Sequence, residues 1–229
     1  MSTITSAGGL ASTGGTLARA RLTTTLELLL VFAGILLYIW RWQYTYPWAC
    51  FLLFAGILLS HVVHRDTLRE LGLTTANLGT SARIALPLAL ALYLPIVAYG
   101  FARHALVLGV APTRHALAWF AGYGVWCTFQ QYLTQSYFHH RLMSLIDNHH
   151  LSSLLVAIMF GGTHLPNPIL IVATTVGGFM LAEIFAHHRN IWPLALAQWV
   201  GGLLIAAVSP QSLIHNMRVG PGYFLYGIR

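Results

Sequence analysis

The sequence contains very little charge. Asp, Glu, Lys and Arg make up 7% of the 229 residues, all twelve basic residues are arginines, and only five residues are acidic. Hydrophobic residues make up 57% of the chain, and the mean hydropathy is +0.68. This composition lies far outside that of soluble globular domains, so it predicts an integral membrane protein.

Cysteine is scarce as well. Cys50 and Cys127 lie within or beside apolar runs and have no CxxC spacing, so we expect small packed side chains rather than a disulfide or metal ligands. The formal net charge of +7 comes from arginines spread singly between apolar runs, which excludes a nucleic-acid-binding tract. The sequence also contains no phosphate loop, nucleophile elbow or kinase signature.

Apolar runs of membrane-spanning length dominate the chain. A chain of 229 residues has room for about six to eight spans of roughly 20 residues each. We predict an all-α, polytopic transmembrane helix bundle of about seven spans, in which short connections make neighbouring helices antiparallel. The expected spans are residues 26–41, 46–63, 83–102, 115–138, 150–163, 168–187 and 191–208.

The chain has room for one transmembrane domain, predicted over residues 26–210. Residues 1–25 are rich in Ser, Thr, Gly and Ala, which predicts a mostly disordered cytoplasmic tail. Charged residues keep the segment 61–81 in water or at the interface, as an exposed or amphipathic loop. Residues 211–229 form a C-terminal tail, and its turn at Gly220-Pro221-Gly222 could fold back over a cavity.

Arginine placement predicts the orientation. If the first two spans form a hairpin, one side carries the residues Arg19, Arg21, Arg65, Arg69 and Arg83. Positive-inside bias then places the N-terminus in the cytoplasm, with the protein in the cell (inner) membrane and the lipid bilayer as its first partner.

Polar residues in the second half are not explained as span ends. The fourth span carries Gln130, Gln131 and Gln135, the seventh carries Gln198, and His164 lies beside a Pro-Asn-Pro break. Such amides cannot face lipid cheaply. They are either interhelical hydrogen-bond partners that hold the bundle together, or they converge with His164 on one cavity in the membrane.

The motif Phe160-x-x-x-His164 followed by Leu-Pro-Asn167 resembles the second motif of the CPBP family, also called Abi or CAAX-protease-like intramembrane proteases. Gln130-Gln131-x-x-x-Gln135 stands where that family has Glu-Glu-x-x-x-Arg. After Ile191-Trp192-Pro193, Gln198-x-x-x-Gly202 stands where it has His-x-x-x-Asn. With the loop Glu70-Leu71-Gly72-Leu73, the resemblance covers roughly residues 70–208. It implies a CPBP-like core.

The departures from that family concern its chemical groups. The resemblance implies a glutamate that activates water, two histidines, and an asparagine that stabilises the oxyanion. Here the positions read Gln130, His164, Gln198 and Gly202. An amide cannot accept a proton near neutral pH, so the usual proteolytic route is not expected. One histidine among amides is also a poor zinc site, so no metal is predicted at the family site and the cofactor is unknown.

Glu183 is the acidic residue deepest in the second half of the chain, and it lies four residues before His187 on one helix face. This pair could act as an acid–base couple, supply ligands, or be a helix-end pair at the headgroups. Adjacent histidines at 139/140, 149/150 and 187/188, with His61 and His64, also leave open a His-rich di-iron membrane oxygenase, although no full histidine box is present.

The leading hypothesis is an atypical CPBP-like protein with an intramembrane cavity centred on His164. The cavity receives a lipidic, isoprenoid-like substrate or a membrane peptide, with non-standard chemistry. The expected catalytic residues are His164, Glu183, Gln130 and Gln131, and the expected substrate contacts are Gln135, Gln198, Asn167 and His187. The alternatives are a conventional intramembrane endopeptidase, a non-catalytic pseudoprotease and the di-iron oxygenase.

Overall fold

The computed structural model describes residues 7–104 and 114–225, and every regular element within these ranges is helical. Helical segments covering 18–45, 78–102, 168–188 and 191–208 are long and apolar enough to cross a membrane, and those at 49–64 and 149–162 are apolar but shorter. The prediction of an all-α membrane protein is therefore confirmed. Helical stretches cover the seven predicted ranges; four of them meet the length and hydropathy of a span, and two more are apolar but shorter.

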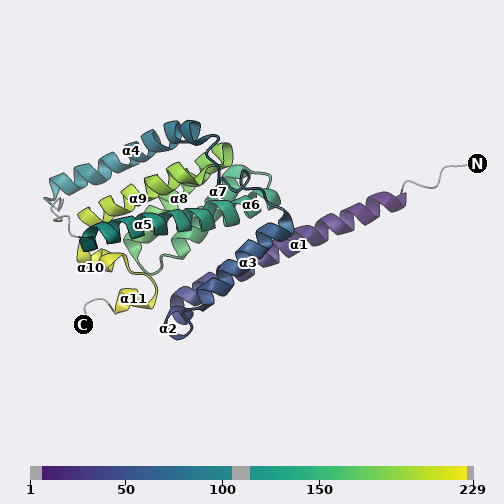
Figure 1. Cartoon of the computed structure of the whole chain (residues 1–229), viewed down its shortest axis with the longest axis horizontal. Helices are drawn as coiled ribbons and strands as arrows, with labels where there is room; N and C mark the ends of the chain where they lie inside the picture. Colours follow the sequence, from purple (N-terminus) through teal and green to yellow (C-terminus); the bar gives the residue numbers. More distant parts are fainter. Residues whose placement is uncertain (1–6, 105–113, 226–229) are drawn as a thin grey trace, which may run out of the picture.

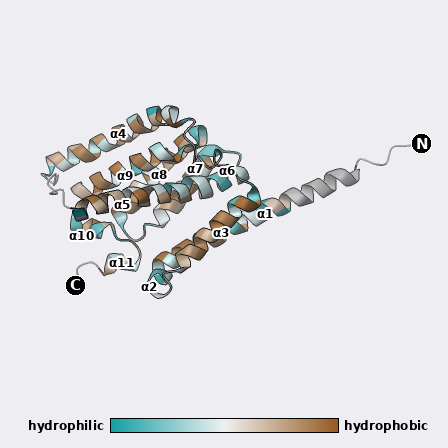
Figure 2. Cartoon of the chain, in the orientation of Figure 1, coloured by the Kyte–Doolittle hydropathy of each residue, from teal (hydrophilic) through white to brown (hydrophobic). Residues whose placement is uncertain are grey.

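The first two spans form a hairpin beside the main bundle (Figure 1). It consists of α1 (Ala7–Leu37), a π-helical turn η1 (Tyr38–Trp42), the short α2 (Gln43–Thr45) and α3 (Ala49–His64). The two long helices approach closely at Gly34, where a Cβ would lie 2.7 Å from Leu53 Cδ2. Figure 2 shows α3 and the adjoining half of α1 as largely apolar, which suits helices that face lipid.

Helix α1 extends further toward the N-terminus than the composition predicts. Residues 7–25 are helical, whereas a disordered tail was expected there; residues 1–6 lie outside the described part of the chain. Thr23, Thr24 and Thr25 each donate a hydroxyl hydrogen bond to the carbonyl four residues earlier. Helix therefore continues from the apolar span because these polar side chains are satisfied within it.

The main bundle contains α4 (Leu78–Ala102), α5 (Arg114–Gln131), α7 (His149–Gly162), α8 (Pro168–His188) and α9 (Ile191–Val208). Helix α5 runs on into the π-helical η2 (Tyr132–His139) and then α6 (His140–Leu145). Asparagine side chains cap the last three bundle helices: Asn148 accepts from Leu151 N, Asn167 from Leu170 N and Asn190 from Trp192 N. Glycine lets α7 and α8 meet, because a Cβ on Gly161 would lie 2.0 Å from Thr175 Oγ1.

The sequence predicts that the charges of the loop between α3 and α4 lie in water or at the interface, but one of them is buried. The Asp66 side chain is only 7% exposed, and Arg141 binds it through two hydrogen bonds of 3.0 and 2.6 Å. The expectation was wrong at this residue because an arginine from α6, 75 positions later, supplies a buried partner.

The C-terminal segment folds back beneath the turn between α7 and α8. It contains α10 (Gln211–Ile214), a 3₁₀ turn η3 (His215–Met217) and α11 (Pro221–Phe224). Gly220, at a φ of +56°, donates its N–H to Leu165 O at 2.7 Å. Asn167 Nδ2 donates to Ile214 O and Arg218 O at 2.7 and 3.1 Å.

Candidate functional site

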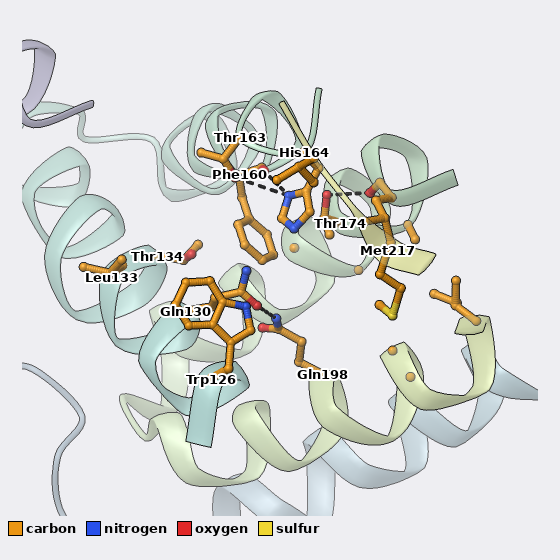
Figure 3. Close-up of a pocket in the computed structure, with 18 of the residues that line it drawn as sticks. Trp126, Gln130, Leu133, Thr134, Phe160, Thr163, His164, Thr174, Gln198 and Met217 are labelled. Carbon is orange, nitrogen blue, oxygen red and sulfur yellow. Dashed lines mark hydrogen bonds between the residues drawn. The ribbon is translucent and has the colours of Figure 1, made fainter. Parts of the chain in front are cut away.

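A cavity of about 1470 Å³ lies between the hairpin and the bundle. Its walls come from α1, α3, α4, α5, α7, α8 and α9, and the C-terminal segment adds Leu213, Met217 and Val219. Most of the lining side chains are apolar. The labelled side chains with polar atoms in Figure 3 are Trp126, Gln130, Thr134, Thr163, His164, Thr174 and Gln198.

His164 is held in a fixed orientation at the end of α7. Its backbone N–H donates to Gly161 O at 2.9 Å, and its carbonyl accepts from Asn167 N at 2.9 Å. Its Nδ1 lies 2.8 Å from Phe160 O, and because a carbonyl only accepts, Nδ1 carries the proton. The Nε2 atom therefore keeps its lone pair, and Figure 3 shows that side of the ring pointing into the cavity.

Burial keeps the His164 ring neutral. The residue is 8% exposed, and the Phe160 ring stands perpendicular to it at a centroid distance of 5.0 Å. Burial lowers the pKa of His164 below its ordinary value, and the hydrogen bond to Phe160 O opposes this only in part. At pH 7 the cavity therefore contains an imidazole that can accept a proton or a hydrogen bond.

Three glutamines form a hydrogen-bonded chain beside this histidine. Gln131 Nε2 donates to Gln198 Oε1 at 2.6 Å, and Gln198 Nε2 donates to Gln130 Oε1 at 2.6 Å. Gln130 and Gln198 line the cavity, whereas Gln131 is fully buried behind them. In Figure 3 the Gln130 amide nitrogen points toward the Phe160 side of the cavity. These three amides thus supply a hydrogen-bond donor to the cavity, but none of them is a base that could take up a proton.

At position 202, where the family has an asparagine, this chain has a glycine against which a tyrosine packs. A Cβ on Gly202 would lie 1.9 Å from Tyr123 Oη and 2.9 Å from Tyr123 Cζ. Tyr123 therefore fills the space in which a side chain at 202 would start.

Carboxylates are absent from the described lining of the cavity, as are arginines. His164 is the only lining group there that exchanges protons near pH 7. The site can accept a hydrogen bond, donate one from an amide, and surround a long apolar chain.

Gln135 and Asn167, two of the four predicted substrate contacts, lie away from the cavity. Gln135 is buried and meets His139 Nδ1 at 3.1 Å, while His139 Nε2 contacts Ser153 Oγ at 3.2 Å. Asn167 caps α8 and anchors the C-terminal segment, as described above. Neither lines the cavity, so any effect on its occupant acts through the helices they hold.

Glu183 and His187 lie at the far end of α8 from His164. Glu183 is fifteen positions beyond Pro168, which places it about 22 Å further along the helix. Its carboxylate meets His150 Nδ1 at 2.8 Å, while His187 Nδ1 lies 3.0 Å from the Glu183 carbonyl. The pair shares a helix face as predicted, but it is not part of the His164 cavity.

A buried charged cluster was missed from the sequence. Glu27 in α1 accepts hydrogen bonds from Tyr137 Oη at 2.8 Å and Ser60 Oγ at 2.5 Å, and Arg141 Nε lies 3.7 Å away. The same arginine binds Asp66, as described above. The signal that could have found this cluster is a lone acid within the first apolar run, because an acid in a span requires a partner.

Comparison with known proteins supports the resemblance in the sequence. Residues 112–204 match the family model described as type II CAAX prenyl endopeptidase Rce1-like. No curated protein and no solved structure matches the chain. The matched range contains His164 and the positions at 130, 131, 135, 198 and 202, whereas the Glu70–Leu73 loop lies outside it. The chain is therefore a membrane protein whose residues 112–204 match an Rce1-like domain of the CPBP, or CAAX-protease, family.

Proposed function

We propose that this protein binds a lipidic, isoprenoid-like molecule in the His164 cavity, and that it does not cut peptides by glutamate-activated water. One observation carries the proposal: the cavity is large and apolar, and its single strong proton-exchanging group stands among amides. Ligand pockets commonly measure about 300–1,000 Å³. At about 1470 Å³ this cavity has room for a long hydrocarbon chain.

The lining favours a ligand with an uncharged polar end. His164 Nε2 offers an acceptor and the Gln130 amide offers a donor, which suits a hydroxyl, thioether or ester. A diphosphate would enter without a compensating cation, because no arginine belongs to the described lining. A prenyl chain with a neutral end, or a prenylated membrane peptide, therefore fits better than a prenyl diphosphate.

A second candidate is an enzyme that uses His164 as acid or base. The hydrogen bond from Nδ1 to Phe160 O favours it, because this bond leaves Nε2 unprotonated and oriented. Binding and catalysis share the same occupant. They differ in whether the ligand leaves chemically changed.

A photoreactive farnesyl-type probe tests occupancy of the cavity. Gly177 lines the cavity, and a Cβ added there would meet no atom within 4 Å, so Gly177→Leu places a side chain in the cavity. Gly122 also has open space but lies on α5 outside the cavity, so Gly122→Leu is the matched control. We expect Gly177→Leu to reduce labelling about tenfold, a loss of about 1.4 kcal/mol in binding, and Gly122→Leu to leave it unchanged. Equal labelling of all three proteins would overturn the proposal.

Peptide cleavage and lipid profiles separate the candidates. A prenylated peptide incubated with the purified protein should remain intact; cleavage that disappears in His164→Ala would instead establish a peptidase. Lipid and metabolite profiles of cells with and without the protein, and with His164→Ala or Gln130→Ala, then test the enzyme. Unchanged profiles in every strain would exclude it and leave the binding function.

We also propose that the N-terminus is cytoplasmic. The end of the bundle that holds the α3–α4 loop carries Arg65, Arg69 and Arg83 together with Arg141 and Arg189, which follows positive-inside bias. A reporter enzyme active only outside the cytoplasm should be silent when fused at the N-terminus. An active fusion would reverse the orientation.

A further inference from the structure

We propose that His149, His150 and Glu183, with His187 as the fourth ligand, bind a divalent metal ion of the zinc class. We call these four residues the α7–α8 histidine cluster. His149 and His150 begin α7, and Glu183 and His187 lie in the final turns of α8. The cluster lies at the end of the two helices opposite His164, so the proposal does not depend on the cavity or its occupant.

The ligand atoms are already near one another. His149, His150 and Glu183 each offer one nitrogen or oxygen, and all three atoms lie within 4.8 Å of one another. His150 Nδ1 and Glu183 Oε2 are 2.8 Å apart, and the rings of His149 and His150 have centroids 3.9 Å apart. Zinc–ligand bonds of about 2.0–2.2 Å require neighbouring ligands a little over 3 Å apart. Side-chain rotation alone would bring the three atoms into this range.

His187 has a free nitrogen oriented by its backbone. Its Nδ1 lies 3.0 Å from the Glu183 carbonyl, so Nδ1 carries the proton and Nε2 keeps its lone pair. A ring N–H donated to a backbone carbonyl is the usual arrangement that fixes a metal-binding histidine. The His187 ring stands 5.2 Å from that of His149 at an interplanar angle of 83°. His187, the proposed fourth ligand, therefore lies beside His149 in the cluster.

The surroundings suit entry of a cation. The His150 side chain is 65% exposed and that of Glu183 is 23% exposed, so an ion reaches the carboxylate from water. The last carbonyls of α8 add partial negative charge at this end of the helix. The Asn148 cap holds the backbone of the two α7 histidines.

The donor set selects the metal class. Three imidazoles and one carboxylate match the nitrogen and oxygen ligands of Zn²⁺, Co²⁺ and Ni²⁺. Mg²⁺ and Ca²⁺ take oxygen ligands almost entirely and should bind poorly here. A bound ion would join the start of α7 to the end of α8 and hold together the helical pair that carries the His164 turn.

Metal binding is measured on the full-length protein, purified in detergent through an affinity tag without histidine and stripped with a chelator. Reloading with Zn²⁺ should give about one equivalent per chain and raise the unfolding temperature, while Mg²⁺ should do neither. Co²⁺ as a probe should give the intense visible absorption of a tetrahedral site. The double variant His150→Ala/Glu183→Gln should weaken Zn²⁺ binding by about a hundredfold, as expected for the loss of two ligands.

The control is His104→Asn, which removes an exposed histidine just after the C-terminal end of α4. His104 has a φ of +50°, a conformation that asparagine tolerates. It should leave Zn²⁺ affinity unchanged. His187→Ala should weaken binding about tenfold and alter the Co²⁺ spectrum. Equal Zn²⁺ binding by the wild type and the double variant, with the same elution on gel filtration, would overturn the site. An unchanged Co²⁺ spectrum in His187→Ala would remove the fourth ligand from it.

Discussion

Gly202 and Tyr123 show that the altered family positions are packed against their neighbours. Tyr123 Oη stands where a Cβ at 202 would be, and Gln198 bonds to Gln130 and Gln131 together. A position that had merely lost its function would leave a void beside it. Tyr123 instead fills the space beside position 202, and the three amides bond to one another, while Gln131 Oε1 stays buried without a partner. This complementarity favours a site adapted to a different occupant.

Restoring the family asparagine should therefore damage the protein. Gly202→Asn overpacks the site against Tyr123, and we expect a loss of about 1–3 kcal/mol in the free energy of unfolding. Tyr123→Ala in the same chain should recover part of it. Gly122→Asn is the control, because open space surrounds Gly122 on an exposed face of α5. Thermal unfolding in detergent measures all four proteins, and equal losses at 202 and 122 would contradict the packing argument.

At the scale of elements, the turn from α7 to α8 is the junction that positions His164. Asn167 serves it twice: its Oδ1 caps α8 by accepting from Leu170 N, and its Nδ2 holds the C-terminal segment through Ile214 O and Arg218 O. One side chain thus couples the start of a span to the segment that contributes to the cavity wall.

Substitutions at Asn167 should separate these two roles. Asn167→Ser keeps a capping oxygen but loses both donated hydrogen bonds, whereas Asn167→Ala also loses the cap, which costs about 1 kcal/mol more. Both should speed protease cleavage within residues 211–225. Asn148→Ala, which removes the cap of α7, should lower stability without this effect. Cleavage as slow as in the wild type would contradict the anchoring role.

Most element boundaries follow from the sequence. The prediction of spans at 168–187 and 191–208 agrees with α8 and α9 because Asn167-Pro168 and Asn190 mark both starts with side-chain caps. The sequence did not predict which groups the buried polar side chains bind. Spacing places Glu183 and His187 on one face, but the carboxylate turns to His150 on another helix, and such pairing depends on how helices assemble. The sequence left two alternatives for the glutamines: hydrogen bonds between helices, or a shared cavity with His164. In the structure Gln130, His164 and Gln198 line one cavity, and the glutamines also bond to one another.

At the scale of the whole molecule, one charged cluster joins the hairpin to the bundle. Arg141 contacts Asp66 of the α3–α4 loop, Ser60 of α3 and Glu27 of α1. His61 and His140 also meet the Asp66 carboxylate, at 2.7 and 3.2 Å. Breaking one side of a buried ion pair costs about 3–5 kcal/mol, so this cluster holds the hairpin against the bundle.

The Asp66 carboxylate should make stability fall in acid. Burial alone would raise its pKa, but the hydrogen bonds from Arg141 and His61 outweigh this and hold the pKa of Asp66 well below its ordinary value. Its contribution is therefore complete above about pH 4, the ordinary pKa, and is lost as the pH falls through that value toward the folded-state pKa, at up to about 1.4 kcal/mol per pH unit. Asp66→Asn should lower stability at pH 7 and flatten this acid dependence, whereas Asp147→Asn, at an exposed carboxylate, should leave both nearly unchanged. Unfolding temperatures measured from pH 7 to pH 3 decide the matter: parallel curves for the wild type and Asp66→Asn would show that another group governs acid unfolding.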